Sequence, residues 1–288
     1  MKLYLTDENN NKIDLLGETG IWLTDVTGMG AEAEEGYADL SYGFFELTND
    51  RNHPQQSING TLIFTGENAN AAWEDFAGRV LRADELYIAA APVSDSREYL
   101  RRIRVRYMQK DDRKRNYLSV PVSFTCLTPW YERQKLEIGM APVPTDAARF
   151  DEARFDEDVF TASFDKSFTA EIPAAGHLPA ALDFSFSGAV ENPVLTLRGA
   201  DTGRLYARCA IAVTLSAGDR LEYSSEPTGC YVRKVTNGTA VDLSGLVSPD
   251  ADPFALIPVT EGCVLTFDGD EDPDGEATAA VRYYYRSI

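Results

Sequence analysis

The alternation of apolar and polar residues in short runs limits the fold of this chain more than any other feature. In Tyr99 to Met108, Ile103, Val105 and Tyr107 alternate with arginines, and a period of two places one set of side chains on each face of a β-strand. We expect these three residues on one face. Other strand-like runs, separated by Gly, Pro, Asn and Asp clusters, are Lys2 to Thr6, Lys12 to Leu16, Ile21 to Val26, Leu40 to Leu47, Ile58 to Thr65, Leu86 to Ala91, Tyr117 to Leu127, Phe168 to Ile172, Leu182 to Ser187, Val194 to Leu197, Leu205 to Ile211, Arg220 to Tyr223, Cys230 to Val235, Ala255 to Ile257, Val264 to Phe267 and Thr278 to Arg286. These runs predict a mostly β protein. The second half has no helical crossover segments, so we do not expect a parallel sheet there.

One segment, about Ala71 to Arg82, has helical rather than strand periodicity. Its apolar residues fall on one face of a helix, at Trp73, Phe76, Ala77 and Val80. We expect Asn70 to cap the free N–H groups, with Glu74 and Asp75 in the first turn, where the helix dipole favours negative charge. The stripe predicts a single substantial helix that packs on a sheet.

Chain length indicates two domains, because a single hydrophobic core rarely grows beyond about 250–300 residues and this chain has 288. We expect an N-terminal β-sandwich domain that carries the helix (1–131), a linker (132–165) and a C-terminal β-sandwich or jelly roll (166–288). The linker is expected because strand alternation stops there, prolines occur at 142 and 144, and a short tandem repeat covers 148–157.

The charge balance is strongly acidic, with 46 acidic and 27 basic residues and a formal net charge of -19. The excess is uneven, since residues 132–288 hold 26 acidic and 13 basic side chains. Such a chain is repelled by nucleic-acid phosphates and by anionic membranes. We therefore expect neither as an adhesive partner.

The four cysteines are far apart and form no C-x-x-C motif: Cys126, Cys209, Cys230 and Cys263. Asp7 and Glu8 interrupt the place where a signal peptide needs an apolar run. No apolar stretch approaches the roughly 20 residues of a membrane-spanning helix. The pattern predicts cytosolic synthesis with free, mostly buried thiols and no membrane association.

Residues for catalysis are scarce. The two histidines, His53 and His177, lie in loop-like segments beside or near a proline, and neither adjoins a nucleophile motif. A Ser-His-Asp or Cys-His site needs a base within hydrogen-bond reach of its nucleophile. We therefore expect no enzyme activity and no cofactor.

Two short motifs resemble catalytic or metal sites. Asp201-Thr202-Gly203 matches the D-T-G of aspartic proteases, but no apolar strand leads directly into it and no second copy exists, so we interpret it as a hairpin turn. The acidic run 270–275 matches the opening of a calcium loop, but Val281 stands at position 12, where a bidentate Glu is required. We expect an acidic turn and no metal.

The basic run around the strand Tyr99 to Met108 has two interpretations. Arg102, Arg104 and Arg106 are predicted to share one face of this strand. Nucleic-acid binding is disfavoured, because no aromatic residues are interleaved on that face and the protein is acidic. The arginines are expected to pair with acidic groups, either within their own subunit or on a neighbour, for instance in the segment 32–35.

A set of motifs occurs in a fixed order in the first half: Ile21-Trp22-Leu23 running to Gly28-Met29-Gly30, Ile58 to Phe64, the helix with Trp73 and Phe76, the arginine-rich strand, and Phe124 to Tyr131 with its T-P-W-Y ending. This order resembles the N-terminal domain of the distal tail proteins of long, non-contractile-tailed bacteriophages. The second half is similar to the galectin-like C-terminal sandwich of the same family, through Gly176 to Ala180, Leu182 to Gly188, Asn192 to Leu197, Ala217 to Leu221, Asp252 to Val259 and Val281 to Ile288. The resemblance covers nearly the whole chain apart from 132–165.

This resemblance implies a structural role at the tip of a phage or prophage tail. In the family, the protein forms a ring, usually a hexamer, that joins the tail tube to tail-tip, adsorption or receptor-binding proteins and lets DNA pass without specific binding. It also implies a virion tail-tip location after synthesis in the bacterial cytoplasm. We assign Arg102, Arg104 and Arg106 to the ring interface.

A carbohydrate-binding module is the alternative, because sandwiches of this kind often hold sugars. Sugar sites usually present an aromatic platform. All three tryptophans, at 22, 73 and 130, lie in the first domain, which leaves Tyr206, Tyr223 and Tyr231 as candidates in the second.

Overall fold

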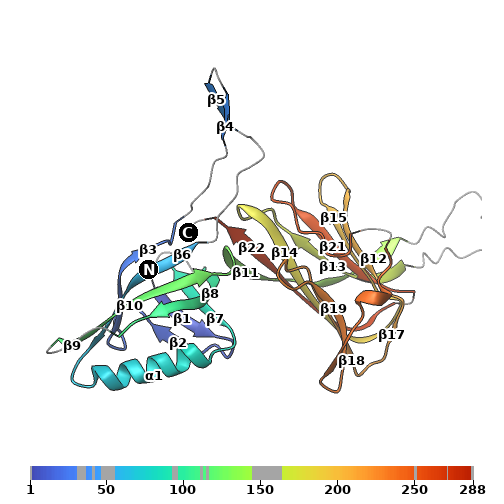
Figure 1. Ribbon diagram of the computed structural model, residues 1–288. Helices are drawn as coiled ribbons and strands as arrows, with labels where there is room; N and C mark the ends of the chain where they lie inside the picture. The colour runs from blue at the N-terminus through green and yellow to red at the C-terminus, as the bar shows by residue number, and fades with distance from the viewer. Residues whose placement is uncertain are drawn as a thin grey trace, which may run out of the picture. The chain divides into compact units, whose positions relative to one another are not determined.

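The computed structural model describes residues 2–30, 37–40, 43–46, 56–92, 97–110, 113–114, 117–144, 164–249, 252–270 and 272–286 (Figure 1). The chain divides into two compact units. The first comprises Met1–Glu132 together with Tyr284–Ile288, and the second comprises Arg133–Tyr283. The segment Tyr284–Ile288 is thus grouped with the first unit.

The first unit is an antiparallel sheet with one helix against it. Its strands are β1 (Lys2–Asp7), β2 (Lys12–Asp14), β3 (Ile21–Thr27), β4 (Tyr37–Leu40), β5 (Gly43–Glu46), β6 (Ser57–Thr65), β7 (Leu86–Ala91), β8 (Tyr99–Met108), β9 (Arg113–Lys114) and β10 (Tyr117–Cys126). Hydrogen bonding follows the order β2-β1-β7-β8, and β8 continues through β10 to β6 and β3. Where one strand was expected over 40–47, β4 and β5 form a hairpin.

The helix α1 (Ala69–Arg82) begins two residues before its expected start (Figure 1). Asn68 precedes it without a side-chain capping bond, so the prediction that Asn70 caps the helix is wrong. The early start follows from a turn at Gly66, whose φ is +98° and whose carbonyl accepts the N–H of Ala69 at 3.3 Å. Glu74 and Asp75 consequently lie beyond the first turn.

The predicted apolar stripe of α1 packs on the sheet as expected. Phe76 and Val80 are buried, and α1 contacts β6 and β10. Phe64 of β6 meets the rings of Trp73 and Phe76 edge-on, with centroids 5.7 and 5.4 Å apart. Edge-to-face pairs of this kind add to the free energy gained by burying the rings.

The second unit contains two antiparallel sheets. One has the order β22 (Asp274–Tyr285), β14 (Leu178–Glu191), β18 (Asp219–Ser224), β19 (Tyr231–Thr236) and β20 (Thr239–Asp242), with β17 (Thr214–Leu215) also paired to β14. The other has the order β12 (Gly139–Pro144), β13 (Phe164–Ile172), β21 (Cys263–Asp268), β15 (Val194–Gly199) and β16 (Leu205–Ala210). The expected run 255–257 forms only a bridge between Ile257 and Ala180.

Aromatic side chains from both sheets form the core of the second unit. The Phe267 ring of β21 lies 4.8 Å from the ring centroids of both Phe184 and Phe186 of β14, and Phe168 of β13 lies 5.8 Å from Phe186. This contact between inner faces is the arrangement of a β-sandwich. The mostly β fold class with one α-helix is thus confirmed for the described residues, whereas the galectin-like assignment stays a prediction.

Part of the expected linker is strand. β11 (Trp130–Leu136) and β12 occupy its beginning, and β13 starts at Phe164. Pro142 and Pro144 are compatible with a strand because, among the described strands, β12 pairs with β13 alone, and an edge strand tolerates a residue that cannot donate a ladder bond. Residues 145–163, with the tandem repeat, lie outside the described residues.

The prediction of mostly buried thiols is confirmed. None of the four cysteines forms a disulfide, and only Cys230 is exposed. Within the described residues, no helix is long and apolar enough to cross a membrane.

Candidate functional site: the arginine strand

The strand β8 lies between β7 and β10, and its arginines occupy different environments. Ile103 is opposite Cys126 and faces the core, where its exposed fraction is 2%. Arg104 is opposite Thr125 on the other face and is exposed. The predicted alternation therefore holds over the middle of the strand.

A β-bulge at Arg106 interrupts that alternation. Val105 pairs with Phe124 and Tyr107 pairs with Ser123, so Arg106 is the extra residue on β8. As a result, Tyr107 does not share the buried face of Ile103 and is 45% exposed. The expectation that Tyr107 lies on the apolar face is wrong for this reason.

Arg101 belongs to the same basic run in the sequence, but unlike the other arginines of this strand it is buried. It is 6% exposed; its Nε donates to the Thr128 carbonyl at 2.9 Å, and its Nη2 donates to Gln56 Oε1 at 2.8 Å. The guanidinium lies over the Trp130 ring, 5.6 Å from its centroid. Burial lowers the pKa of Arg101 from its usual value. Its position two residues before Ile103, on the buried face, was the available sequence signal.

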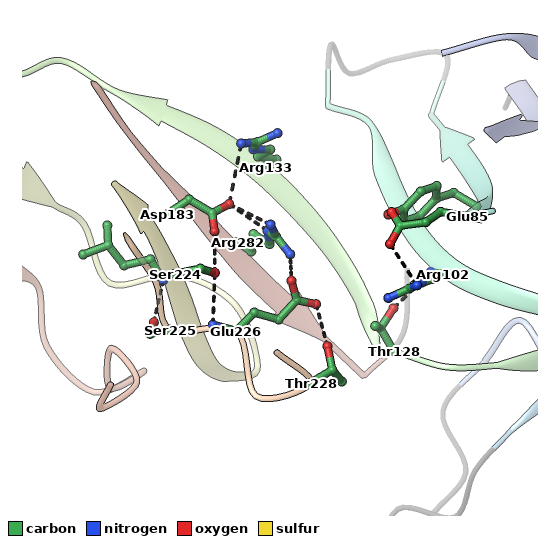
Figure 2. Close-up of polar contacts among 12 residues, drawn as sticks. Glu85, Arg102, Thr128, Arg133, Asp183, Ser224, Ser225, Glu226, Thr228 and Arg282 are labelled. Carbon is green, nitrogen blue, oxygen red and sulfur yellow. Dashed lines mark hydrogen bonds and ion pairs between the residues drawn. The ribbon is translucent and has the colours of Figure 1, made fainter. Parts of the chain in front are cut away.

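Arg102 pairs within its own unit. Its Nη2 lies 2.8 Å from Glu85 Oε1, and its backbone N–H donates to Thr128 Oγ1 at 3.0 Å (Figure 2). Glu85 also accepts a short bond from the Tyr87 hydroxyl. Burial, followed by this bond, raises the pKa of Tyr87 above its usual range. The interpretation of pairing within one subunit therefore applies to Arg102.

Arg104 and Arg106 differ from Arg102, because both are exposed and neither forms an ion pair or side-chain hydrogen bond within the described part of the chain. The acidic segment 32–35, considered as their partner on a neighbouring copy, lies outside the described residues. The structure thus brings the three arginines to one strand but leaves two guanidinium groups available to another molecule.

The two sequence motifs that resembled catalytic or metal sites lie at the ends of strands. Asp201-Thr202-Gly203 forms the turn between β15 and β16, closed by a bond of 2.9 Å from the Gly203 N–H to the Gly199 carbonyl. Of the acidic run 270–275, Asp270, Asp272 and Pro273 lie between β21 and β22, Asp274 and Gly275 begin β22, and Glu271 is outside the described residues. No group of three or more His, Cys, Asp or Glu side chains suited to a metal ion occurs among the described residues. His177 is described and His53 is not.

A model of a known protein family matches most of the first unit. Residues 2–127 match the family described as distal tail protein, N-terminal domain. No curated protein matches the chain.

Solved structures share the fold along nearly the whole chain. A chain of the phage P2 baseplate in its activated conformation with calcium has 11% identity, covers 100% of this chain and 99% of its own, and has a TM-score of 0.68. The strontium form of that baseplate gives the same values. The SPP1 Dit protein, described as a paradigm of hub adsorption apparatus in phages that infect Gram-positive hosts, has 12% identity, 98% coverage of both chains and a TM-score of 0.57.

Proposed function

We propose that this chain, whose residues 2–127 match the family of distal tail protein N-terminal domains, is a structural hub of a phage or prophage tail tip. The family match in the first unit carries the proposal, and the shared fold with baseplate and hub chains supports it. The role is one of assembly without catalysis. Its place is the virion tail tip, after synthesis in the bacterial host cytoplasm.

In this proposal, the first unit closes into a ring, a hexamer in the form typical of the family. Ring closure needs a heterologous interface, in which one surface of a copy meets a different surface of the next copy. Arg104, Arg106 and the exposed Tyr107 supply one surface, because their polar groups are not used within the described part of the unit. Arginine and tyrosine are enriched at protein interfaces.

An acidic surface at the edge strand β3 is the proposed complement. Within the described part of the unit, one edge of β3 pairs with β6, whereas its other edge forms a single bridge, between Trp22 and Leu16, and has no strand partner beyond Leu23. Glu18 and Asp25 are exposed there, and Trp22 is 46% exposed. The acidic segment 32–35 follows this strand in sequence. The guanidinium of Arg102 is already paired with Glu85, so we do not assign it a bond across this contact.

The ring joins the tail tube on one side to tail-tip, adsorption or receptor-binding proteins on the other. DNA passes through the ring without specific binding. The net charge of -19 supports this part of the proposal, because an acidic wall does not retain phosphates.

Native mass spectrometry of the full chain tests the ring. We expect hexamers for the wild type and mainly smaller species for Arg104→Glu, whose reversed charge meets the acidic surface. The control is Arg82→Glu, which reverses an exposed charge in the last turn of α1 and should leave hexamers intact. Undiminished hexamers in Arg104→Glu would remove Arg104 from the interface. A wild type that stays monomeric at high concentration, even with tube and tip partners, would refute the ring.

A further inference from the structure

A polar groove of about 520 Å³ lies on one face of the second unit, along the sheet formed by β22, β14, β18 and β19. The register places Asp183, Ser224 and Tyr231 in one row across neighbouring strands, and Ser185, Glu222 and Arg233 in the next. These side chains share one face of the sheet because each is directly opposite the next.

Each of the two carboxylates of the groove bonds to two arginines, and Asp183 also accepts a hydrogen bond from a hydroxyl. Asp183 Oδ2 lies 2.8 Å from Arg282 Nη2 and 3.5 Å from Arg133 Nη2, and its Oδ1 accepts from Ser224 Oγ at 2.8 Å (Figure 2). Glu222 lies 2.6 Å from Arg220 and 2.7 Å from Arg233. The acceptor capacity of the groove is therefore largely occupied by its own cations.

The polar groups that remain are mainly donors and hydroxyls. Lys135 Nζ and the hydroxyls of Ser185, Thr278 and Tyr231 have no hydrogen bond or ion pair within the described part of the chain. Arg233 is held against the Tyr231 ring, 4.4 Å from its centroid, which leaves the Tyr231 hydroxyl as the polar end of a fixed stack.

The groove is also electropositive in an acidic region. Its charged lining consists of four cations and two anions, namely Arg133, Lys135, Arg233, Arg282, Asp183 and Glu222. Residues 132–288 as a whole hold twice as many acidic as basic side chains, 26 against 13. Lys135 and Arg133 are exposed, so this charge is accessible to a ligand.

The shape and composition of the groove favour a saccharide over a protein partner. Ser185 and Ala280 are small residues along it, and none of the large exposed apolar residues of the described chain lines it. Protein interfaces depend on buried aromatic or aliphatic anchors, whereas a ligand rich in hydroxyl groups can bond to Ser185, Thr278 and Tyr231. We propose that this groove binds an anionic oligosaccharide, with its carboxylate or phosphate at Lys135 and Arg133.

This proposal is independent of ring formation, because every residue of the groove belongs to the second unit of one chain. It assigns Tyr231 among the three tyrosines considered from the sequence. Tyr223 is 3% exposed and donates to the Pro253 carbonyl, and Tyr206 donates to Glu261.

A glycan array probed with the full wild-type chain tests the ligand class. The array carries neutral, uronate-bearing and phosphate-bearing oligosaccharides, and hexaglutamate is the peptide probe. We expect binding confined to anionic glycans, and the uronate and phosphate sets decide the source of the anion. Binding to no glycan, to neutral glycans equally, or to hexaglutamate as tightly as to the best glycan would overturn the proposal.

Calorimetry with the best array glycan then tests the site. We expect Lys135→Ala to weaken binding on the order of tenfold, because it removes a charge-assisted bond, and Tyr231→Phe on the order of fivefold. Arg208→Ala on β16, in the other sheet, should bind like the wild type. All three variants should keep the wild-type melting temperature. Wild-type affinity in Lys135→Ala, or an equal loss in Arg208→Ala, would contradict the assigned groove.

Discussion

The arginines of β8 and those on the β14–β18–β19–β22 face illustrate two uses of the same side chain. On that face of the second unit, Arg282 and Arg233 each bond to a carboxylate presented by a neighbouring strand. On β8, only Arg102 has such a partner, and Arg104 and Arg106 have none within the described residues. A paired guanidinium stabilises the sheet that holds it, whereas an exposed and unpaired one is available to another molecule.

The largest effect should come from removing the shared carboxylate of the second unit. Asp183→Ala leaves Arg133 and Ser224 without their acceptor, and Arg282 then depends on Glu226. Breaking such a partly buried network costs roughly 3 kcal/mol of unfolding free energy. Urea denaturation should show this loss, and a midpoint like that of the wild type would mean that the arginines find water or other partners at no cost.

The dependence of stability on acid pH tests a second carboxylate that is paired within the second unit, Asp219. Its bonds from Lys234 and Thr236 lower its pKa to about 2. Because the unfolded chain takes up a proton at higher pH, the stability that ionised Asp219 contributes is complete above about pH 4. This contribution is lost as the pH falls towards 2. We expect urea midpoints of the wild type to fall more steeply than those of Asp219→Asn between pH 4 and 2, and parallel curves would contradict the pairing.

A double-mutant cycle on Arg102 and Glu85 measures the coupling free energy of the ion pair that β8 forms with Glu85. Their side chains are 34% and 39% exposed, so solvent screens the interaction and the coupling should be about 0.5–1 kcal/mol. Unfolding by urea of Arg102→Ala, Glu85→Ala and the double variant gives the value. A coupling near zero would place Arg102 with the unpaired arginines.

The smallest effect on stability is expected at Arg104 and Arg106. Replacing either with Ala removes no ion pair of the described residues, so the unfolding free energy should change by less than about 0.5 kcal/mol. Native mass spectrometry of the same samples should nevertheless show fewer rings. A large loss of stability in the isolated chain would show that these arginines are bonded within their own subunit.

Much of the fold could be predicted because alternation and turn chemistry are local. The strands β1, β6, β7 and β10 follow the expected runs closely, and the stripe with Phe76 and Val80 located α1. The strand β20 was not among the expected runs, although Asn237 and Gly238, with φ of +50° and +81°, form the kind of turn that joins two strands.

Errors arose where a distant part of the chain decides the local outcome. β12 forms despite two prolines because β13, beyond residue 163, supplies a partner on its one paired edge. Tyr107 is exposed because the register with β10 places a bulge at Arg106. The residues of β12 do not indicate that β13 will pair with them, and the residues around Tyr107 do not indicate their register with β10.

The sequence by itself determined the strand periodicity, the acidic charge and the scarcity of catalytic groups. Only the tertiary structure decided which charges meet. Asp183 and Arg282 are 99 residues apart, and their contact depends on the pairing of β14 with β22. Arg101 and Arg104 have the same side chain on one strand, yet opposite faces make the first a buried donor and the second an exposed charge. The physical reason is that a side chain's environment is set by strand register and sheet order, which depend on contacts between distant segments.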